Sequence, residues 1–102
     1  MQMTLAIYRT SAGFPKEELF GLTSQMRRAA VAVASNIAEV YGRNSKGEYK
    51  QFLGIARGSN LELQTQLFIA KELGYSNPRN ITEAKDLSTE VAKMLNALIA
   101  KL

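Results

Sequence analysis

Apolar side chains recur along most of this chain at intervals of three and four residues, the spacing that places them on one face of an α-helix. The two prolines, Pro15 and Pro78, stand among other helix-breaking residues and therefore mark boundaries between helices. Strand-like alternation and long internal repeats are absent from the sequence. The pattern predicts an all-α fold with four main helical segments.

The first predicted helix is short and ends at Gly13. Its apolar face is expected to consist of Met1, Leu5, Tyr8 and Ala12. Beyond it, Pro15, Glu17 and Glu18 favour one or two further helical turns before Gly21.

The second predicted helix runs from Thr23 to Tyr41, with Thr23 or Ser24 as its N-terminal cap. Its apolar seam consists of Leu22, Met26, Ala29, Val33 and Val40, with Asn36 in the same series. Gly42 is expected to close this helix in a left-handed conformation.

The third predicted helix extends from Lys46 to Leu73 and ends at Gly74. Ser45 and Glu48 have the spacing of a capping box, which opens a helix. Only Arg43 and Asn44 separate Gly42 from Ser45, so the second and third helices should form an antiparallel hairpin.

Apolar residues occupy more of the third helix's circumference than one stripe needs. Either this helix is surrounded by its own bundle, or another subunit covers part of it. Gly54 and Gly58 each cost about 1 kcal/mol in a helix interior, and close packing against a backbone would offset that cost.

The fourth predicted helix runs from Ile81 to Leu102 and is clearly amphipathic. Its buried face is expected to consist of Ala84, Leu87, Val91, Leu95, Leu98 and Leu102. Together the segments predict an up-down-up-down antiparallel four-helix bundle with a short first helix, as a single domain over residues 1–102.

The amino-acid composition excludes several kinds of chemical site. The chain has 102 residues, of which 46% are hydrophobic, and it contains neither Cys nor His. Disulfides, thiolate metal sites and histidine-based catalysis are therefore excluded. No apolar run is long enough to span a bilayer, and the first residues do not resemble an export signal, so we expect a cytoplasmic protein without a membrane partner.

The formal net charge of +4 is concentrated in one stretch of the chain. Residues 27–57 contain six Lys or Arg side chains and two acids, whereas the segments before and after are balanced. These cations are candidate phosphate contacts of RNA or DNA: Arg27, Arg28, Arg43, Lys46, Lys50 and Arg57. A solvated basic face is the alternative interpretation.

Four polar residues interrupt the apolar pattern of the second and third helices: Asn36, Glu39, Ser59 and Glu62. We interpret them as polar contacts that fix the register of the bundle. Glu39 is expected to pair with Arg43, with Lys50 or another cation across the hairpin as an alternative. Candidate partners of Glu62 are Gln66, one turn on, and a counter-charge from Arg27, Arg28 or a neighbouring subunit.

A catalytic site is the alternative interpretation of these four polar residues. A carboxylate-bridged dimetal site requires Glu-x-x-His motifs, which the chain lacks. Glu39 and Glu62 with a hard divalent cation remain an alternative, although no calcium-loop or nucleotide-binding motif accompanies them. We therefore expect no catalytic residues, no metal site and no cofactor.

Several motifs, in order and at matching spacing, resemble the family of 23S rRNA intervening-sequence proteins, which are four-helix bundles. These motifs are FPKEE at 14–18, GLTSQMRRAAVAVASNIAE at 21–39, GR at 42–43 and FLGIARGSNLELQTQLFIAKELGY at 52–75. The chain departs from the family pattern at Val40, at Asn60 and in a shorter opening helix, which should leave part of the bundle groove uncovered.

The family is in turn similar to the accessory variability determinant proteins of diversity-generating retroelements. That resemblance implies a homopentamer with a basic surface that binds RNA or DNA, and a reverse transcriptase or another protein as a further partner. We accordingly expect a nonenzymatic, homo-oligomeric nucleic-acid-binding accessory protein. The alternative is an oligomeric protein-interaction scaffold that does not bind nucleic acid directly.

Overall fold

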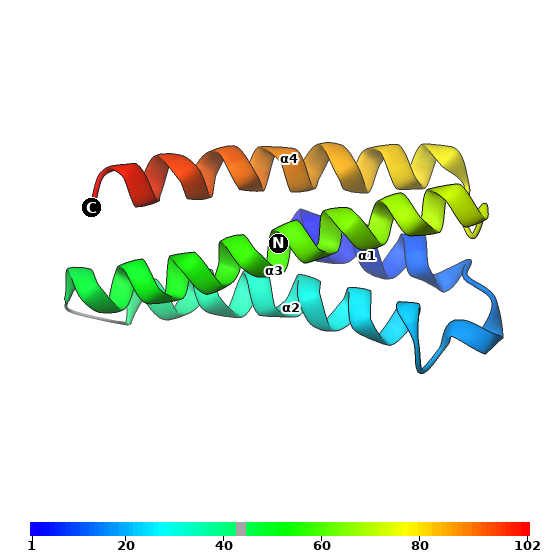
Figure 1. Cartoon of the computed structure of the whole chain (residues 1–102), viewed down its shortest axis with the longest axis horizontal. Helices are drawn as coiled ribbons and strands as arrows, with labels where there is room; N and C mark the ends of the chain where they lie inside the picture. The colour runs from blue at the N-terminus through cyan, green and yellow to red at the C-terminus, as the bar shows by residue number, and fades with distance from the viewer. Residues whose placement is uncertain (43–44) are drawn as a thin grey trace.

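The computed structural model describes residues 1–42 and 45–102. Within them the chain forms four α-helices, α1 (Gln2–Ala12), α2 (Leu22–Tyr41), α3 (Lys46–Leu73) and α4 (Pro78–Ala100), and a short 3₁₀ helix, η1 (Lys16–Glu18). The helices run antiparallel along a body about 43 Å long, close to the roughly 42 Å that 28 residues of α3 require. The predicted up-down-up-down four-helix bundle with a short first helix is confirmed (Figure 1).

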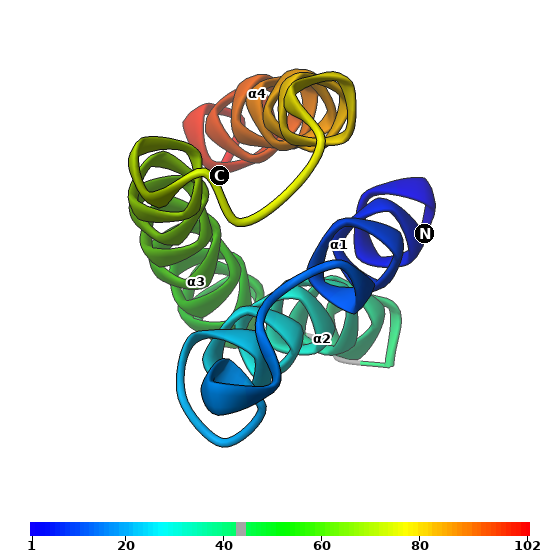
Figure 2. The ribbon, with the colours of Figure 1, turned by 90° about the vertical axis from the view of Figure 1, so that its right-hand side faces the viewer.

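Each helix packs on two neighbours. α2 contacts α1 and α3, and α4 contacts the other sides of α3 and α1. Seen from the end, the helices surround a central core, and η1 lies beside the start of α2 (Figure 2). Every helix therefore has an inner face and an outer face.

The boundaries of α3 follow the local signals in the sequence. The Ser45 hydroxyl accepts a hydrogen bond from the Glu48 backbone N–H at 3.1 Å and donates one to the Glu48 carboxylate at 3.2 Å. At the other end Gly74 adopts a left-handed conformation, with φ of 68°, which is favourable for glycine. The predicted capping box and helix stop are both confirmed.

Other helix ends differ from the prediction. Gly42 ends α2 at φ of −96°, so it is not left-handed. Neither Thr23 nor Ser24 caps α2, because the helix already begins at Leu22, whose backbone N–H donates to the Glu18 carboxylate at 3.2 Å. A carboxylate from the preceding η1 thus replaces a local cap.

The fourth helix begins three residues before the predicted Ile81. The side chain of Asn77 accepts a hydrogen bond from the backbone N–H of Arg79 at 2.8 Å, and Pro78 occupies the first turn. Proline is favourable there because the first helical N–H groups have no partner within the helix. Pro78 therefore starts α4.

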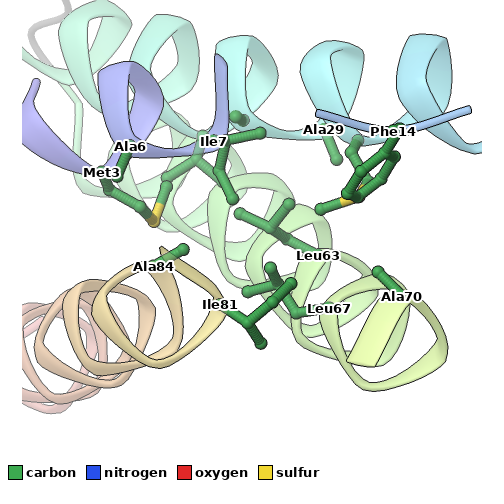
Figure 3. Close-up of a cluster of buried hydrophobic side chains, with 13 residues drawn as sticks. Met3, Ala6, Ile7, Phe14, Ala29, Leu63, Leu67, Ala70, Ile81 and Ala84 are labelled. Atoms are coloured by element: carbon green, nitrogen blue, oxygen red, sulfur yellow. The ribbon is translucent and has the colours of Figure 1, made fainter. Parts of the chain in front are cut away.

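The main core lies where all four helices overlap (Figure 3). α1 contributes Met3, Ala6 and Ile7, and these pack with buried residues of the other helices, among them Met26, Val33, Leu63, Leu67 and Ile81. A smaller cluster of Leu53, Ala56 and Leu95 lies toward the α2–α3 turn. The bundle therefore has a larger and a smaller core.

The predicted apolar face of the first helix was wrong. Met1, Leu5, Tyr8 and Ala12 are exposed. The buried face of α1 consists of Met3, Ala6, Ile7, Thr10 and Ser11. The sequence pattern missed this face because Thr10 and Ser11 are polar. Both hydroxyl groups form hydrogen bonds: Thr10 donates to the Asn80 carbonyl oxygen, and Ser11 donates to the Ile7 carbonyl oxygen.

The short α1 covers only part of the bundle's length. The N-terminus lies near the middle of the bundle, whereas α4 continues to the end that holds the α2–α3 turn (Figure 1). Leu98 and Leu102, which were predicted to be buried, are exposed there, while Leu87 and Val91 are half-buried. They lack cover because no part of α1 reaches the last turns of α4.

Among the residues that the structure describes, no helix has the length and hydropathy of a membrane span.

Candidate nucleic-acid and assembly surfaces

Three of the predicted phosphate contacts form a row along α3. Lys46, Lys50 and Arg57 are all exposed, and spacings of four and seven residues place them on one side of the helix. The row lies on the flank toward α4, since Arg57 is about 60° around the helix from Asn60, whose side chain bonds α4. We call these three residues the basic row.

The basic row has no acidic partner among residues 1–42 and 45–102. The ion pair formed between described residues joins Arg9 and Glu83 at 3.3 Å, on α1 and α4. Arg43 and the expected pair between Glu39 and Arg43 fall outside the described residues.

Arg27 and Arg28 lie apart from the basic row, on α2. Arg27 is held by α1: its Nε donates to the Ser11 hydroxyl at 2.9 Å, and its guanidinium lies 4.7 Å from the centre of the Tyr8 ring. It also donates to the Tyr8 carbonyl oxygen at 3.5 Å. Arg27 therefore joins α1 to α2, whereas Arg28 is exposed.

A shallow groove of about 510 Å³ separates α1, η1 and the outer side of α2. It is lined mainly by Tyr8, Leu19, Phe20, Arg27, Arg28 and Val31. The Phe20 side chain is 92% exposed, which is rare for an aromatic residue in a folded chain. We call this feature the α1–α2 groove.

The outer face of α3 is also apolar. Its large exposed residues are Ile55, Leu61, Phe68, Ile69 and Leu73. Of the two interpretations of this helix, enclosure by its own bundle is excluded, because these side chains face solvent. A side chain added at Gly54 or Gly58 would meet nothing within 4 Å, so the expected close packing at these glycines does not occur within the chain.

The four polar residues of the second and third helices do not form one cluster. Ser59 and Glu62 line a groove with Arg28, whereas Glu39 is eleven residues, about 16 Å, further along α2. The hydrogen bonds described for Asn36 and Glu62 stay within their own helices: Asn36 donates to the Ala32 carbonyl oxygen at 2.7 Å, and Gln66 donates to Glu62 at 3.1 Å. Glu39 and Glu62 are both exposed.

A buried polar pair that the sequence analysis did not single out joins α3 to α4. The Asn60 amide donates to the Ser88 carbonyl oxygen at 3.0 Å, and the Ser88 hydroxyl donates to the Asn60 side-chain oxygen at 2.8 Å. Both residues are almost fully buried. Their signal in the sequence was a polar residue in each apolar seam, between Ala56 and Leu63 and between Ala84 and Leu95.

A second polar contact closes the other end of the bundle. Tyr75 donates a hydrogen bond to the Glu18 carboxylate at 2.8 Å. This bond, with lesser contributions from burial and from the negative charges of Glu18 and Glu17, raises the pKa of the Tyr75 hydroxyl. In the described part of the chain, no three acidic side chains gather where they would hold a metal ion.

Known proteins resemble this chain over nearly its whole length. A crystal structure of a protein of unknown function from the S23 ribosomal protein family of Bacteroides thetaiotaomicron superposes with a TM-score of 0.84. The match covers 96% of this chain and 92% of the other at 21% sequence identity, so it supports the fold alone. No curated protein matches the chain. Residues 1–97 match the 23S rRNA-intervening sequence protein family, and the chain belongs to that family.

Proposed function

We propose that this protein is a nonenzymatic, homo-oligomeric accessory protein that binds RNA or DNA through the basic row of α3. The observation that carries the proposal is the exposure of Lys46, Lys50 and Arg57 on one flank of a long helix. Phosphate contacts by Lys and Arg supply most of the affinity of sequence-independent nucleic-acid binding.

The length of the basic row suits a nucleic-acid strand. Lys46 and Arg57 are eleven residues apart, which corresponds to about 16 Å along the helix. Phosphates of one strand follow each other every 3.4 Å or so along a duplex axis, so about five phosphates pass such a row. Because the family is named after intervening sequences of 23S rRNA, RNA is the first ligand to test.

Oligomerisation would place several copies of the basic row in one assembly. The outer face of α3 carries five large exposed apolar residues, and monomeric proteins rarely leave such a face uncovered. We propose a homopentamer, on the strength of the resemblance to ring-forming accessory proteins. Repetition of three cations around an assembly would raise affinity through simultaneous contacts with one strand.

Charge reversal tests the role of the basic row. The double variant Lys50→Glu/Arg57→Glu should weaken the binding of a fluorescein-labelled single-stranded RNA at least tenfold, which corresponds to a loss of about 1.4 kcal/mol of binding free energy. Fluorescence anisotropy in 50 mM salt measures this affinity. The matched control is Lys16→Glu/Arg79→Glu, which changes the net charge equally at two exposed positions near the other end of the bundle. Equal losses in the two variants would reduce the effect to net charge and refute a localised site.

A protein-interaction scaffold is the second candidate. It is favoured by the apolar face of α3, which suits a protein partner better than a phosphate backbone. In that case the purified protein would assemble normally yet bind neither RNA nor DNA at low salt. Measurement of mass and of nucleic-acid binding on the same sample separates the two candidates.

A further inference from the structure

Two apolar surfaces of this chain are uncovered, and they differ in shape and in charge. The α1–α2 groove is concave, and the outer face of α3 is the convex side of one helix. α1 and α3 lie diagonally across the bundle from each other, with α2 between them on one side (Figure 2). We infer that the outer face of α3 of one copy docks into the α1–α2 groove of the next copy, an inference that rests on the homo-oligomer of the proposed function.

Charge favours this pairing of unlike surfaces. The residues that line the groove include Arg27 and Arg28 and no acid. On α3, Glu62 and Glu72 are both exposed. Glu62 lines a groove with Arg28 of its own chain, so Glu72 is the acid that the outer face of α3 brings to a neighbour. Two grooves placed together would oppose like charges, and so would two α3 faces, whereas a groove against an α3 face brings opposite charges together.

The cations of α3 lie at the margins of this contact. Lys71 is eleven residues from Asn60, which returns it to the side of the helix that faces α4. Arg57 lies on the same flank, as part of the basic row. Leu61 and Phe68 are eleven residues after Lys50 and Arg57 and lie on the same flank, so the basic row and the apolar contact are separated along the helix and not around it. The row occupies the first half of α3 and ends at Arg57, and docking over the second half, from Leu61 to Leu73, leaves Lys46 and Lys50 open to nucleic acid.

Shape favours the pairing as well. Space is open where side chains at Gly54 and Gly58 would lie, so a neighbouring surface can approach the α3 backbone closely. Further along, Leu61 and Phe68 project from the face, 53% and 63% exposed. The groove of about 510 Å³ offers Tyr8, Leu19, Phe20 and Val31 as apolar contacts for such side chains.

The contact is head-to-tail, because each copy uses two different surfaces. Such contacts close into a ring when the rotation between copies allows it and otherwise continue as a filament. Arg28 then contacts a protein neighbour and not phosphate. This assignment gives Arg28 on α2 to assembly, and Lys46, Lys50 and Arg57 on α3 to nucleic-acid binding.

Two assembly-defective variants test the pairing by complementation. The groove variant is Phe20→Ser/Val31→Ser, and the face variant is Leu61→Ser/Phe68→Ser. The control, Tyr41→Ser/Met94→Ser, removes two exposed apolar residues that belong to neither surface. Circular dichroism should show folded protein for all three, because every substituted side chain is at least 41% exposed.

Light scattering and native mass spectrometry should find the groove and face variants monomeric and the control at the native mass. An equimolar mixture of the groove and face variants should form a 1:1 dimer and nothing larger, because only one intact groove and one intact face remain to meet. A mixture that stays monomeric, or a single variant that keeps the native mass, would overturn the inference.

Cross-linking gives a readout that does not depend on loss of assembly. The chain has no cysteine, so Phe20→Cys and Phe68→Cys each introduce one thiol. Under mild oxidation with diamide, a mixture of the two variants should give mainly the mixed disulfide dimer, whereas Tyr41→Cys should not cross-link to either. Predominant Phe20→Cys or Phe68→Cys homodimers would show a symmetric contact and refute the pairing.

These outcomes separate the inference from the proposed function. If the groove variant and the face variant both keep the native mass, this interface is excluded, whereas the proposed homo-oligomer and its function are not. A wild-type chain that is monomeric at micromolar concentration refutes both the interface and the homo-oligomer. Loss of RNA binding in Lys50→Glu/Arg57→Glu with assembly intact supports the assignment of separate surfaces.

Discussion

At the scale of single residues, the buried pair of Asn60 and Ser88 is the polar contact that fixes α3 against α4. The Ser88 hydroxyl donates to the Asn60 side-chain oxygen, and the Asn60 amide donates to the Ser88 backbone carbonyl oxygen, at two positions that are almost fully buried. Removal of one partner leaves a buried polar group without its bond, whereas apolar replacement of both does not. The register of the two helices therefore depends on a matched pair.

Urea unfolding of three variants tests this dependence. Asn60→Ala and Ser88→Ala should each lower the free energy of unfolding, by about 1–3 kcal/mol for the partner left unsatisfied. The double variant Asn60→Leu/Ser88→Ala should recover most of the loss, because no polar group remains unpaired. Additive losses in the double variant would show that the pair does not act as a unit.

The contact between Tyr75 and Glu18 makes stability depend on pH. The pKa of Tyr75 is raised in the folded chain above its ordinary value of 10.0, so the folded state retains the phenolic proton more tightly than the unfolded state does. This contribution is fully present below pH 10 or so and is lost as the pH rises through the folded-state pKa.

Thermal unfolding between pH 8 and 11 checks the sign. The wild type should be more stable than Tyr75→Phe at pH 8, and the difference should shrink as the pH rises toward 11. Charges elsewhere affect both proteins equally, so the comparison isolates the tyrosine. A difference that stays constant or grows with pH would contradict the contact.

At the scale of elements, the sequence predicted those features whose causes are local. The start of α3 is determined by Ser45 and Glu48, and its end by Gly74, so its bounds followed from a few neighbouring residues. The buried face of α1 could not be predicted from its own residues, because Thr10 and Ser11 occupy buried positions and their hydrogen-bond partners lie in other turns or elements. The cap of α2 was missed for the same reason, since Glu18 reaches it from η1.

The candidate surfaces were predictable to different degrees. The basic row lies within one helix, so its spacing was visible in the sequence. The α1–α2 groove combines Tyr8, Phe20 and Arg27 from three segments, and only the tertiary packing of α1 on α2 brings them together. Phe20 carried a weak signal, as an apolar residue between two predicted helices.

The outer face of α3 carries a prediction of its own. Gly54 and Gly58 lie in a helix interior, where glycine costs about 1 kcal/mol relative to alanine, and an added Cβ meets nothing within the chain. In the monomeric groove variant, Gly58→Ala should therefore raise the free energy of unfolding by about 0.5–1 kcal/mol. Destabilisation in urea unfolding would reveal a contact at Gly58 within the folded monomer.

At the scale of the whole molecule, the bundle has a well-packed end and a less covered end. All four helices share the main core, whereas the smaller cluster of Leu53, Ala56 and Leu95 forms where α1 no longer reaches. In the monomeric groove variant, amide hydrogens in the last two turns of α4 should exchange faster than those around Ala84. Equal protection along α4 would mean that the shorter cover of α1 has no energetic effect.

The same whole-molecule arrangement assigns the first half of α3 to nucleic acid and its second half to assembly. The central claim is that the intact oligomer binds nucleic acid through clustered Lys and Arg side chains. The most direct measurement is the affinity of the wild-type assembly for a single-stranded RNA as salt is raised from 50 to 200 mM. We predict that the logarithm of the binding constant falls linearly with the logarithm of the salt concentration, with a slope of about −2 for each set of three phosphate contacts that one protomer makes. No RNA binding by the pure oligomer in 50 mM salt, or an affinity that does not change with salt, would contradict the account.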